Sequence, residues 1–498
     1  MIDSSPFVPI PFHVSARELS SAKPMLFLAI LTVASWQDHQ RQLALDRLYR
    51  TELAQRTIIQ PRRTLSLLQS IVVYLSWYHF IFSHKTQQTV TLLQLAIGMA
   101  LDLNLHQKSK RLLVDLPGRP PPQEPAAVEQ RERQRTYLGC YHLSSALAGG
   151  LAKPNLLKYS EYMASCGKRL RDDLEYPSDE LIARLIPLRR MDDQAHESFY
   201  SEETFDLPFT DSRIFMSLRF LETQMDDWRR ENVSDRFRQA LDLSYAFAEM
   251  QLYSIGLRPP PPSLSWQPAD SNQLKALLSA LEAGKRFFDM LLAFPASDYH
   301  LIPFSEWMRL PFVVITVSRL CIPSDAHAAM QWDVKAAQER VRLDLYLESL
   351  CYRMQGLSTY DKVKQPHPDF WWAMRMIMDL TRAWYVRKIK GENASTSSTV
   401  AHNFLTPDTM QTTSSSAGPG CIMSPADGNS MFSLPGAHGA TNGMSGHMGQ
   451  IVDPVDHGER DPFAFMRSMD FDMDQFLDMG IWGHESYEAM RFGGGGGS

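Results

Sequence analysis

Two pairs of adjacent aspartates are the residues of this sequence whose type and spacing could hold a metal ion. Asp192–Asp193 and Asp226–Asp227 resemble the paired acids with which a terpene cyclase binds diphosphate through Mg²⁺. The first pair lacks a third carboxylate at the following turn. The second pair has Glu231, but no second triad of the Asn-x-x-x-Ser-x-x-x-Glu kind accompanies it. We therefore interpret both pairs as solvated charge on helix faces.

Other catalytic patterns are missing from the sequence. It contains no His-Glu-x-x-His, no Gly-x-Ser-x-Gly and no phosphate loop that ends in Gly-Lys-Ser/Thr. The histidines are scattered, and we interpret His79, His84 and His106 as structural residues near core helices. The sequence thus predicts that the protein is not an enzyme and uses neither a metal nor a cofactor.

The cysteines point to the same conclusion. Cys140, Cys166, Cys321, Cys351 and Cys421 are separated by gaps of 26, 155, 30 and 70 residues. These gaps fit neither a paired zinc knuckle nor a small disulfide framework. A reduced, intracellular protein is the interpretation they favour.

The segment 461–492 alternates acids with bulky apolar residues. Acids keep such side chains solvated and apart, so that they stay free for a partner's groove, as in disordered activation segments that dock as transient helices. The alternative is a terminal helix that packs back on the core. The predicted apolar anchors are Phe471, Phe476, Leu477 and Trp482, and the acids between them are Asp470, Asp472, Asp474 and Asp478.

Charge is distributed unevenly along the chain. The formal net charge is −6, and residues 461–490 alone carry seven acids and one base, so the remainder is balanced. This balance argues against a generally basic surface for nucleic acid. Modest basic clusters lie at 62–63, 108–111, 131–135 and 387–390. They suit nuclear import, a phosphate contact or ordinary helix-surface charge equally well.

The helix around which we expect the chain to be organised is Leu92–His106. Apolar residues recur along it with the three-and-four spacing of one buried helix face, at Leu92, Leu95, Ala96, Met99 and Leu103. Gly98 lies in its middle, where glycine costs about 1 kcal/mol relative to alanine. We therefore expect another backbone to approach the helix closely at Gly98.

The rest of the chain also indicates helices, and no run of alternating strand residues appears. The apolar run 24–36 is too short to cross a bilayer, which needs about 20 residues, so we predict a buried helix. Polyproline stretches at 116–125 and 259–262 predict connectors. The expected helices are 24–36, 37–58, 64–82, 87–104, 126–149, 156–171, 178–190, 211–231, 235–253, 272–294, 302–321, 333–355 and 368–390.

These elements predict an all-α fold, a large multi-helix array over 24–390, with a narrow waist near 172–205. A loose lead-in over 1–23 precedes it. Residues 391–460 are rich in Ser, Thr, Gly and Pro and have too few apolar side chains to offset the entropy of ordering, which predicts a disordered linker. The acidic segment 461–492 and a Gly-rich tail, 493–498, complete the chain.

Three stretches in the first third carry a family resemblance. They are the leucine-glutamine helix Ser66–Tyr78, the helix Leu92–His106 and the charged helix start Arg131–Tyr141, which continues to Lys153–Pro154. In order and spacing they resemble the middle, regulatory region of fungal zinc-cluster transcription factors. The resemblance covers about residues 24–166 well and extends loosely to about 391. It implies an all-helical regulatory domain.

The resemblance also implies a nuclear transcription regulator. The family reads DNA through six closely spaced cysteines that share two zinc ions, and this chain has no such set. We therefore expect weak direct DNA binding unless a zinc cluster is encoded upstream, and recruitment through a DNA-binding partner or a homodimer. The acidic segment would contact the transcription machinery or a coactivator, and we expect no membrane association.

A second hypothesis is a ligand-sensing or co-regulatory module. A small metabolite would bind among the helices of Trp77, Met99 and Tyr141 and mask the acidic segment. The sequence leaves the target genes, the ligand and the choice between activation and repression open.

Overall fold

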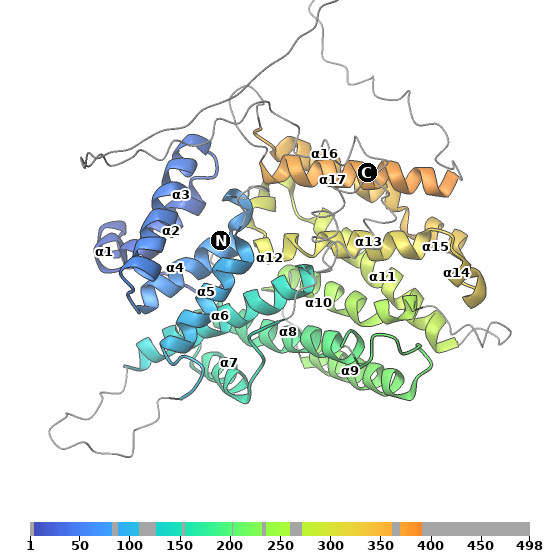
Figure 1. Cartoon of the computed structure of the whole chain (residues 1–498), viewed down its shortest axis with the longest axis horizontal. Coiled ribbons are helices and arrows are strands. Elements are labelled where there is room, and N and C mark those ends of the chain that lie inside the picture. Colours follow the sequence, from blue (N-terminus) through green and yellow to red (C-terminus); the bar gives the residue numbers. More distant parts are fainter. Residues whose placement is uncertain are drawn as a thin grey trace, which may run out of the picture. The chain divides into compact units, whose positions relative to one another are not determined.

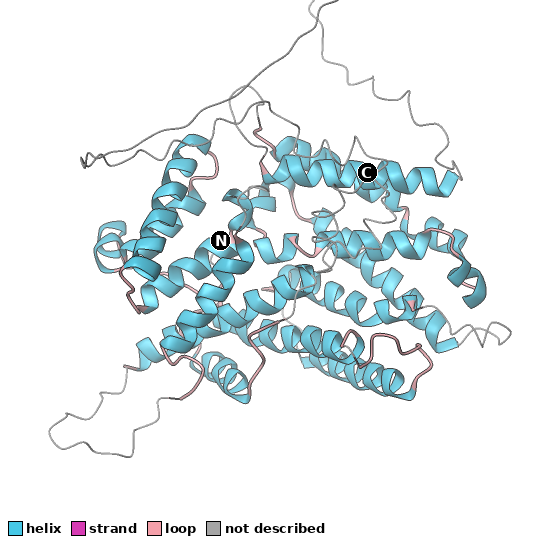
Figure 2. Ribbon diagram, viewed as in Figure 1, coloured by secondary structure: helices cyan, strands magenta, loops and turns pink. Residues whose placement is uncertain are grey.

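The structure is a computed structural model that describes residues 4–81, 88–108, 126–151, 155–201, 203–231, 236–258, 271–360 and 369–390. Within these ranges every regular element is a helix, and none is a strand (Figure 2). The prediction of an all-α fold is confirmed. The predicted linker 391–460, the acidic segment 461–492 and the Gly-rich tail lie outside the described residues.

The first group of helices is built around α2 and α4, which pack against each other, while α2 also contacts α1 and α3. The apolar run 24–36 forms α2, which buries Met25, Leu26, Ala29 and Val33. No helix in the described ranges is both long and apolar enough to span a membrane. The bounds in this group are α1 (Ala16–Ala22), α2 (Pro24–Ala34), α3 (His39–Ala54), η1 (Gln55–Ile59), α4 (Leu65–Ser76), η2 (Tyr78–Ile81) and α5 (Thr89–Asp102).

The second group is centred on α6 and α8. Helix α6 contacts α4, α5, α7 and α8, and α8 in turn contacts α9 and α10 (Figure 1). Because α6 touches both groups, it joins the first helices of the chain to the rest. The bounds are α6 (Ala127–Leu151), α7 (Glu161–Asp173), α8 (Asp179–Phe199), α9 (Ser212–Glu231), α10 (Arg238–Tyr253) and η3 (Ser254–Leu257).

The third group begins with α11, which pairs along its length with α10 and also contacts α13, α15 and α16. Helices α16 and α17 run side by side (Figure 1). The bounds are α11 (Ser271–Ala293), η5 (Ala296–Leu301), α12 (Phe304–Trp307), α13 (Leu310–Cys321), α14 (Asp325–Met330), α15 (Val334–Val341), α16 (Leu343–Leu357) and α17 (Phe370–Lys390).

Side-chain caps fix where several helices begin. The Ser15 hydroxyl accepts from the backbone N–H of Glu18, whose carboxylate accepts from the Ser15 N–H, a capping box that starts α1. Asp38, Thr64 and Asp333 cap α3, α4 and α15 in the same way with one bond each. These caps satisfy amide groups that the first helical turn leaves without partners.

Two stretches predicted as single helices are broken. The predicted helix 302–321 divides into α12 and α13 around Arg309, because Pro311 lies in the first turn of α13 and has no N–H to continue the ladder. The predicted helix 333–355 divides at Arg342, whose φ of 48° is left-handed. A residue in that region ends the helical hydrogen-bond pattern, so α15 stops there and α16 starts anew.

The core consists of two clusters of buried side chains that meet on α8. Ile182 and Ile186 belong to the larger cluster, whereas Leu181 and Leu185 belong to the smaller one, which α8 builds with α9 and α10. The waist predicted near 172–205 stays a prediction. A continuous 21-residue helix runs through most of that region and presents apolar residues to both clusters.

The predicted organising helix forms as α5, with Leu92, Ala96 and Met99 buried. The prediction for Gly98 is wrong. This glycine lies on the exposed face of α5, and a Cβ added there would meet no described atom within 4 Å. The apolar spacing placed the buried face correctly, but Gly98 is not on that face.

Candidate functional site

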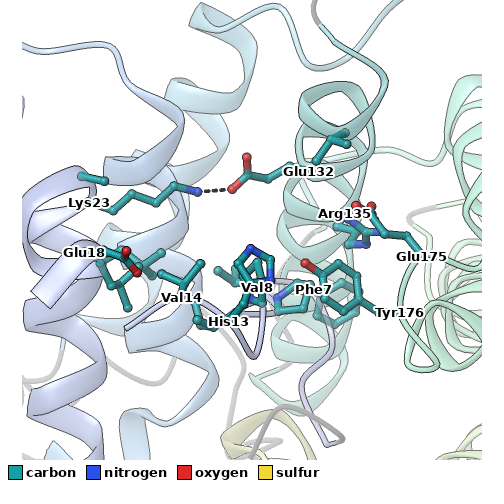
Figure 3. Close-up of a pocket in the computed structure, with 17 residues that line it drawn as sticks. Phe7, Val8, His13, Val14, Glu18, Lys23, Glu132, Arg135, Glu175 and Tyr176 are labelled. Carbon is teal, nitrogen blue, oxygen red and sulfur yellow. Dashed lines mark hydrogen bonds and ion pairs between the residues drawn. The ribbon is translucent and has the colours of Figure 1, made fainter. Parts of the chain in front are cut away.

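A pocket of about 450 Å³ lies between the N-terminal residues and the first half of α6 (Figure 3). One wall is formed by residues 7–14, α1 and the start of α2, and the other by α6 and the turn after α7. Apolar side chains and prolines dominate the first wall, namely Phe7, Val8, Pro9, Ile10, Pro11 and Leu26.

Residues 4–14, which we call the N-terminal strap, are held against α4 and α6. Phe7 and Val8 are buried, and the Phe7 ring lies 4.9 Å from the His142 ring. Ser5 donates to the Ser76 hydroxyl at 3.0 Å. The strap cannot be helical because its closely spaced prolines lack N–H groups. Residues 5–8 of the predicted loose lead-in are thus packed against α4 and α6, whereas α1 buries no residue.

A glycine of α6 makes the close approach of the strap possible. A Cβ added to Gly139 would lie 2.7 Å from the Phe7 Cβ and 3.3 Å from Val72 Cγ1. No ordinary side chain fits in that space without moving the strap. The close approach expected at Gly98 is found instead at Gly139, and it is made by the side chains of Phe7 and Val72.

An ion pair between Lys23 and Glu132 crosses the pocket from α2 to α6 (Figure 3). Gln69 of α4 is buried and supports it, since its Nε2 donates to Glu132 Oε1 at 3.0 Å and its Oε1 accepts from Lys23 at 3.3 Å. Gln69 also donates to the Thr136 hydroxyl at 3.3 Å. Three helices are therefore joined by one polar network beside the pocket.

Arg135 anchors the other side of the pocket. Its side chain is 2% exposed, and its Nε and Nη2 donate to the two carboxylate oxygens of Asp179 at 2.6 and 2.8 Å. Nη2 also donates to Glu175 at 2.7 Å, and the guanidinium lies 4.7 Å from the centre of the Tyr176 ring. The bidentate pair fixes the start of α8 to α6, and the bond to Glu175 holds the turn between α7 and α8.

The rest of the basic cluster 131–135 is also paired. Arg131 donates to Glu175 at 2.8 Å and to Asp173 at 3.3 Å. Burial alone would raise the pKa of Glu175, but the hydrogen bonds from Arg131 and Arg135 outweigh it and lower that pKa. Arg133 donates to the Leu103 carbonyl at the end of α5 at 2.7 Å. This cluster therefore serves to hold helices together.

In the acidic pair Asp192–Asp193, Asp192 is buried and Asp193 is half-buried, so the interpretation as solvated charge is wrong. Asp193 accepts from Tyr141 at 2.6 Å, from Ser145 at 2.7 Å and from Asn155 at 2.9 Å. Three neutral donors, two from α6 and one from the following loop, therefore hold this carboxylate.

The other member of the pair lies between two fully buried arginines. Asp192 is 2.6 Å from Arg189 and 3.8 Å from Arg309, and Arg309 also donates twice to Glu306 at 2.7 Å. Burial raises the pKa of Asp192 to about 6 against the opposing effect of Arg189. No local pattern predicted this centre, because Arg309 lies more than 100 residues from Asp192 in the chain.

The second acidic pair, Asp226–Asp227, is exposed on α9, and Asp227 pairs with Arg230. Its interpretation as solvated charge agrees with this position. No group of three or more His, Cys, Asp or Glu in the described ranges is arranged to hold a metal ion. The four described cysteines are free thiols, and Cys421 lies outside the described residues.

The predicted structural histidines differ in environment. His79 is buried among aromatic rings, the closest being Phe80 at 4.0 Å, and neither ring nitrogen has a hydrogen-bond partner among the described residues. Burial, with a smaller contribution from His300, lowers the pKa of His79 to about 3. His106 is half-buried, and His84 lies outside the described residues.

The ligand cavity was predicted among the helices that carry Trp77, Met99 and Tyr141, which are core residues. Trp77, Met99 and Tyr141 are buried, and none of them lines the pocket, although α6 contributes to its wall through Val128 and Glu132. Sequence reasoning missed the strap. The available signals were the alternating prolines and apolar residues of 6–11 and the Ser15-x-x-Glu18 capping pattern.

The predicted activation-segment residues cannot be placed relative to this pocket. The anchors Phe471, Phe476, Leu477 and Trp482, and the acids Asp470, Asp472, Asp474 and Asp478, lie outside the described residues.

Comparison with protein families bears on the part of the chain that holds the pocket. Residues 12–180 match the family described as the fungal specific transcription factor domain. The domain contains α1 to α7 and every pocket residue from His13 to Tyr176, and the strap residues 7–11 lie just before it. The resemblance predicted from the sequence motifs is confirmed.

Relatives extend the similarity beyond this domain. The transcription factor opdL of Penicillium oxalicum is 25% identical over 324 residues, which are 63% of this chain and 56% of that protein. The transcription factor himD of Aspergillus japonicus is 25% identical over 337 residues, 65% of this chain and 54% of that protein. The transcription factor pbcR of Emericella nidulans is 23% identical over 339 residues, 64% of this chain and 44% of that protein.

The aligned part of the chain therefore spans about half the length of these relatives. No solved structure matches the chain significantly.

Proposed function

We propose that this protein is a nuclear regulator of transcription by RNA polymerase II, acting through binding rather than catalysis. The observation that carries the proposal is the match of residues 12–180 to the fungal specific transcription factor domain. The three relatives are all named transcription factors. In this proposal the helical array is the regulatory part, and other segments make the contacts to DNA and to the transcription machinery.

The acidic segment 461–492 is the proposed activating element. Its apolar anchors would insert into a groove of a coactivator or of the transcription machinery as one face of a short helix. The intervening acids would keep the free segment solvated and would steer it toward a basic surface. Support comes from the concentration of the whole net charge of the chain, −6, in residues 461–490.

A fusion experiment tests the activating element directly. Residues 451–492 are joined to an unrelated DNA-binding domain, and transcription of a reporter with the matching site is measured. The proposal expects clear activation above the DNA-binding domain alone. A reporter level equal to that of the empty fusion would remove activation from the proposed function.

Recruitment to DNA is the second part of the proposal. The chain itself would bind duplex DNA weakly, because it has no set of six closely spaced cysteines and its charge outside the acidic segment is balanced. A DNA-binding partner, a homodimer or a zinc cluster encoded upstream would supply the recognition. Co-precipitation of promoter DNA with the tagged protein, with and without candidate partners, tests this dependence.

The pocket favours a second candidate function, a ligand-sensing module. A cavity of about 450 Å³ with a mainly apolar wall lies inside the size range of small-molecule sites. It also lies where the strap, α2 and α6 meet, so a ligand would contact elements from both ends of the family domain. A thermal-shift screen of the purified chain against metabolites tests this role, and a flat response across a broad panel would count against it.

A further inference from the structure

We infer that the pocket binds a largely apolar small molecule that is neutral or cationic, and that the bound molecule clamps the strap against α6. The inference rests on the ligand-sensing role proposed above and adds the chemical class of the ligand and the mechanical effect of binding. It is independent of how the chain activates transcription.

We expect an apolar ligand because apolar side chains face the pocket from both of its walls. Val8, Ile10, Val14 and Leu26 face the pocket from the N-terminal side, and Val128 faces it from α6. Transfer of an apolar group from water to such a surface is favourable. The volume accommodates a molecule of drug-like size.

The charge of the ligand follows from the ionic groups beside the wall. The lining holds three carboxylates, Glu18, Glu132 and Glu175, and two cations. Both cations are already engaged, since Lys23 pairs with Glu132, and Arg135 pairs with Glu175 and with Asp179 behind it. An anionic ligand would have to displace a carboxylate from one of these pairs and then lie next to it.

A neutral or cationic ligand meets no such penalty. Its hydrogen-bond donor can share the Glu132 carboxylate, which is about one-third exposed and is held in place by Gln69. A carboxylate accepts several hydrogen bonds at once, so the ion pair with Lys23 can persist. The site therefore selects against acids and accepts alcohols, amides and amines.

A bound molecule would clamp the strap because the two walls of the pocket belong to different elements. The strap and α1 form one wall, α6 forms the other, and a bound molecule contacts both. Phe12 is fully exposed and Arg17 is exposed, so proteases can cut the free strap and α1 at these residues once they open. A ligand that binds only the closed arrangement reduces that opening by mass action.

The test uses the purified full chain and Nile red, a neutral apolar fluorescent probe. Saturable binding to the wild type is expected. Ala22→Trp, which places a bulky side chain on the lining at the exposed end of α1, should weaken binding at least tenfold. Ser21→Trp adds the same bulk at the neighbouring exposed position, which does not line the pocket, and should bind like the wild type.

The opposite wall provides an independent pair of variants. Val128→Trp fills the pocket from the exposed first turn of α6, and Ala127→Trp next to it does not. Equal probe binding by both members of both pairs would overturn the assignment of the pocket. Circular dichroism of each variant establishes that it is folded, and a variant that is misfolded is replaced by its partner on the opposite wall.

Displacement tests the ligand class with three probes that share one chain, 1-decanol, decylamine and decanoate. The alcohol and the amine should displace Nile red and should slow cleavage by chymotrypsin at Phe12 and by trypsin at Arg17. Decanoate should do neither at the same concentration. Displacement by decanoate equal to that by decanol would contradict the charge argument. Binding without protection from proteolysis would contradict the clamp, and neither result depends on reporter activation.

Discussion

Arg135 illustrates how single charged residues hold this fold together. It is 2% exposed and pairs with Asp179, which is fully buried. Removing one member of a buried pair leaves the other charge without compensation, which typically costs about 3–5 kcal/mol. We predict that Arg135→Ala lowers the free energy of unfolding by about that amount, as measured by urea denaturation. Arg213→Ala breaks the exposed pair with Asp211 and should leave the urea midpoint within error of the wild type.

His79 makes stability depend on pH. Its pKa is lowered to about 3 in the folded chain, against about 6.5 when unfolded. Below pH 6.5 the unfolded chain therefore binds a proton that the folded chain does not, so stability present at neutral pH is lost as the pH falls. From pH 7.5 to 5 this loss amounts to about 2 kcal/mol.

The variant His79→Phe keeps a ring among aromatic neighbours and removes the titrating group. We predict that its urea midpoint falls less than that of the wild type between pH 7.5 and 5. Burial also lowers the pKa of His142 to about 3. His142 therefore contributes equally to the loss of stability of both proteins as the pH falls, and its effect cancels in the comparison. An equal fall in both proteins would show that His79 is accessible to protons in the folded state.

At the scale of single residues, the sequence predicted where charged helix segments begin but not which side chains pair with one another. The charged start of α6 was recognised from Arg131 to Arg135, yet nothing in the spacing showed that Glu175 and Asp179 would meet it. The sequence alone predicts surface charge for Asp192–Asp193, because the exposure of these side chains depends on which helices pack over them. Burial of a polar side chain is decided by tertiary packing, which local sequence does not encode.

At the scale of elements, we predict that alanine has opposite effects on the free energy of unfolding at two helical glycines. Gly98 faces open space on α5, so Gly98→Ala should raise the free energy of unfolding by roughly 0.5–1 kcal/mol through helix propensity. Gly139 lies under Phe7, and Gly139→Ala should lower it by about 1–3 kcal/mol, because the strap must move.

Urea denaturation of the two alanine variants measures both changes in the free energy of unfolding. Proteolysis then shows which of the two variants loosens the strap. Gly139→Ala should speed cleavage by chymotrypsin at Phe12, whereas Gly98→Ala should not. If both variants were stabilised to the same extent, the close contact between the strap and α6 would be excluded.

The positions of the helices were largely predictable, and their interruptions were not. Apolar spacing located the buried face of α5 and the extents of α9 and α11 to within a few residues. The left-handed Arg342 between α15 and α16 gave no signal, because arginine rarely adopts that conformation. The long α8 was underestimated, since its acids and arginines looked like a surface segment although several of them are buried.

At the scale of the whole molecule, the balance of charge predicts how tightly the chain binds DNA. Outside residues 461–490 the acids and bases are equal in number, and the acidic segment repels a polyanion. We predict that the purified chain binds duplex DNA no more tightly than roughly micromolar at physiological salt and without sequence preference. Fluorescence titration with labelled duplex measures this, and submicromolar binding that survives excess competitor DNA would reveal a recognition element in the chain.

The regulatory account rests most heavily on the acidic segment, and one reporter measurement tests it in the full chain. The protein is tethered to a promoter through a heterologous DNA-binding domain, and the anchors Phe471, Phe476, Leu477 and Trp482 are changed together to alanine. A matched variant changes four apolar residues of the preceding linker, Ile422, Met423, Phe432 and Leu434. The account predicts that the anchor variant loses activation while the linker variant keeps it at equal protein levels. Full activation by the anchor variant would contradict the account.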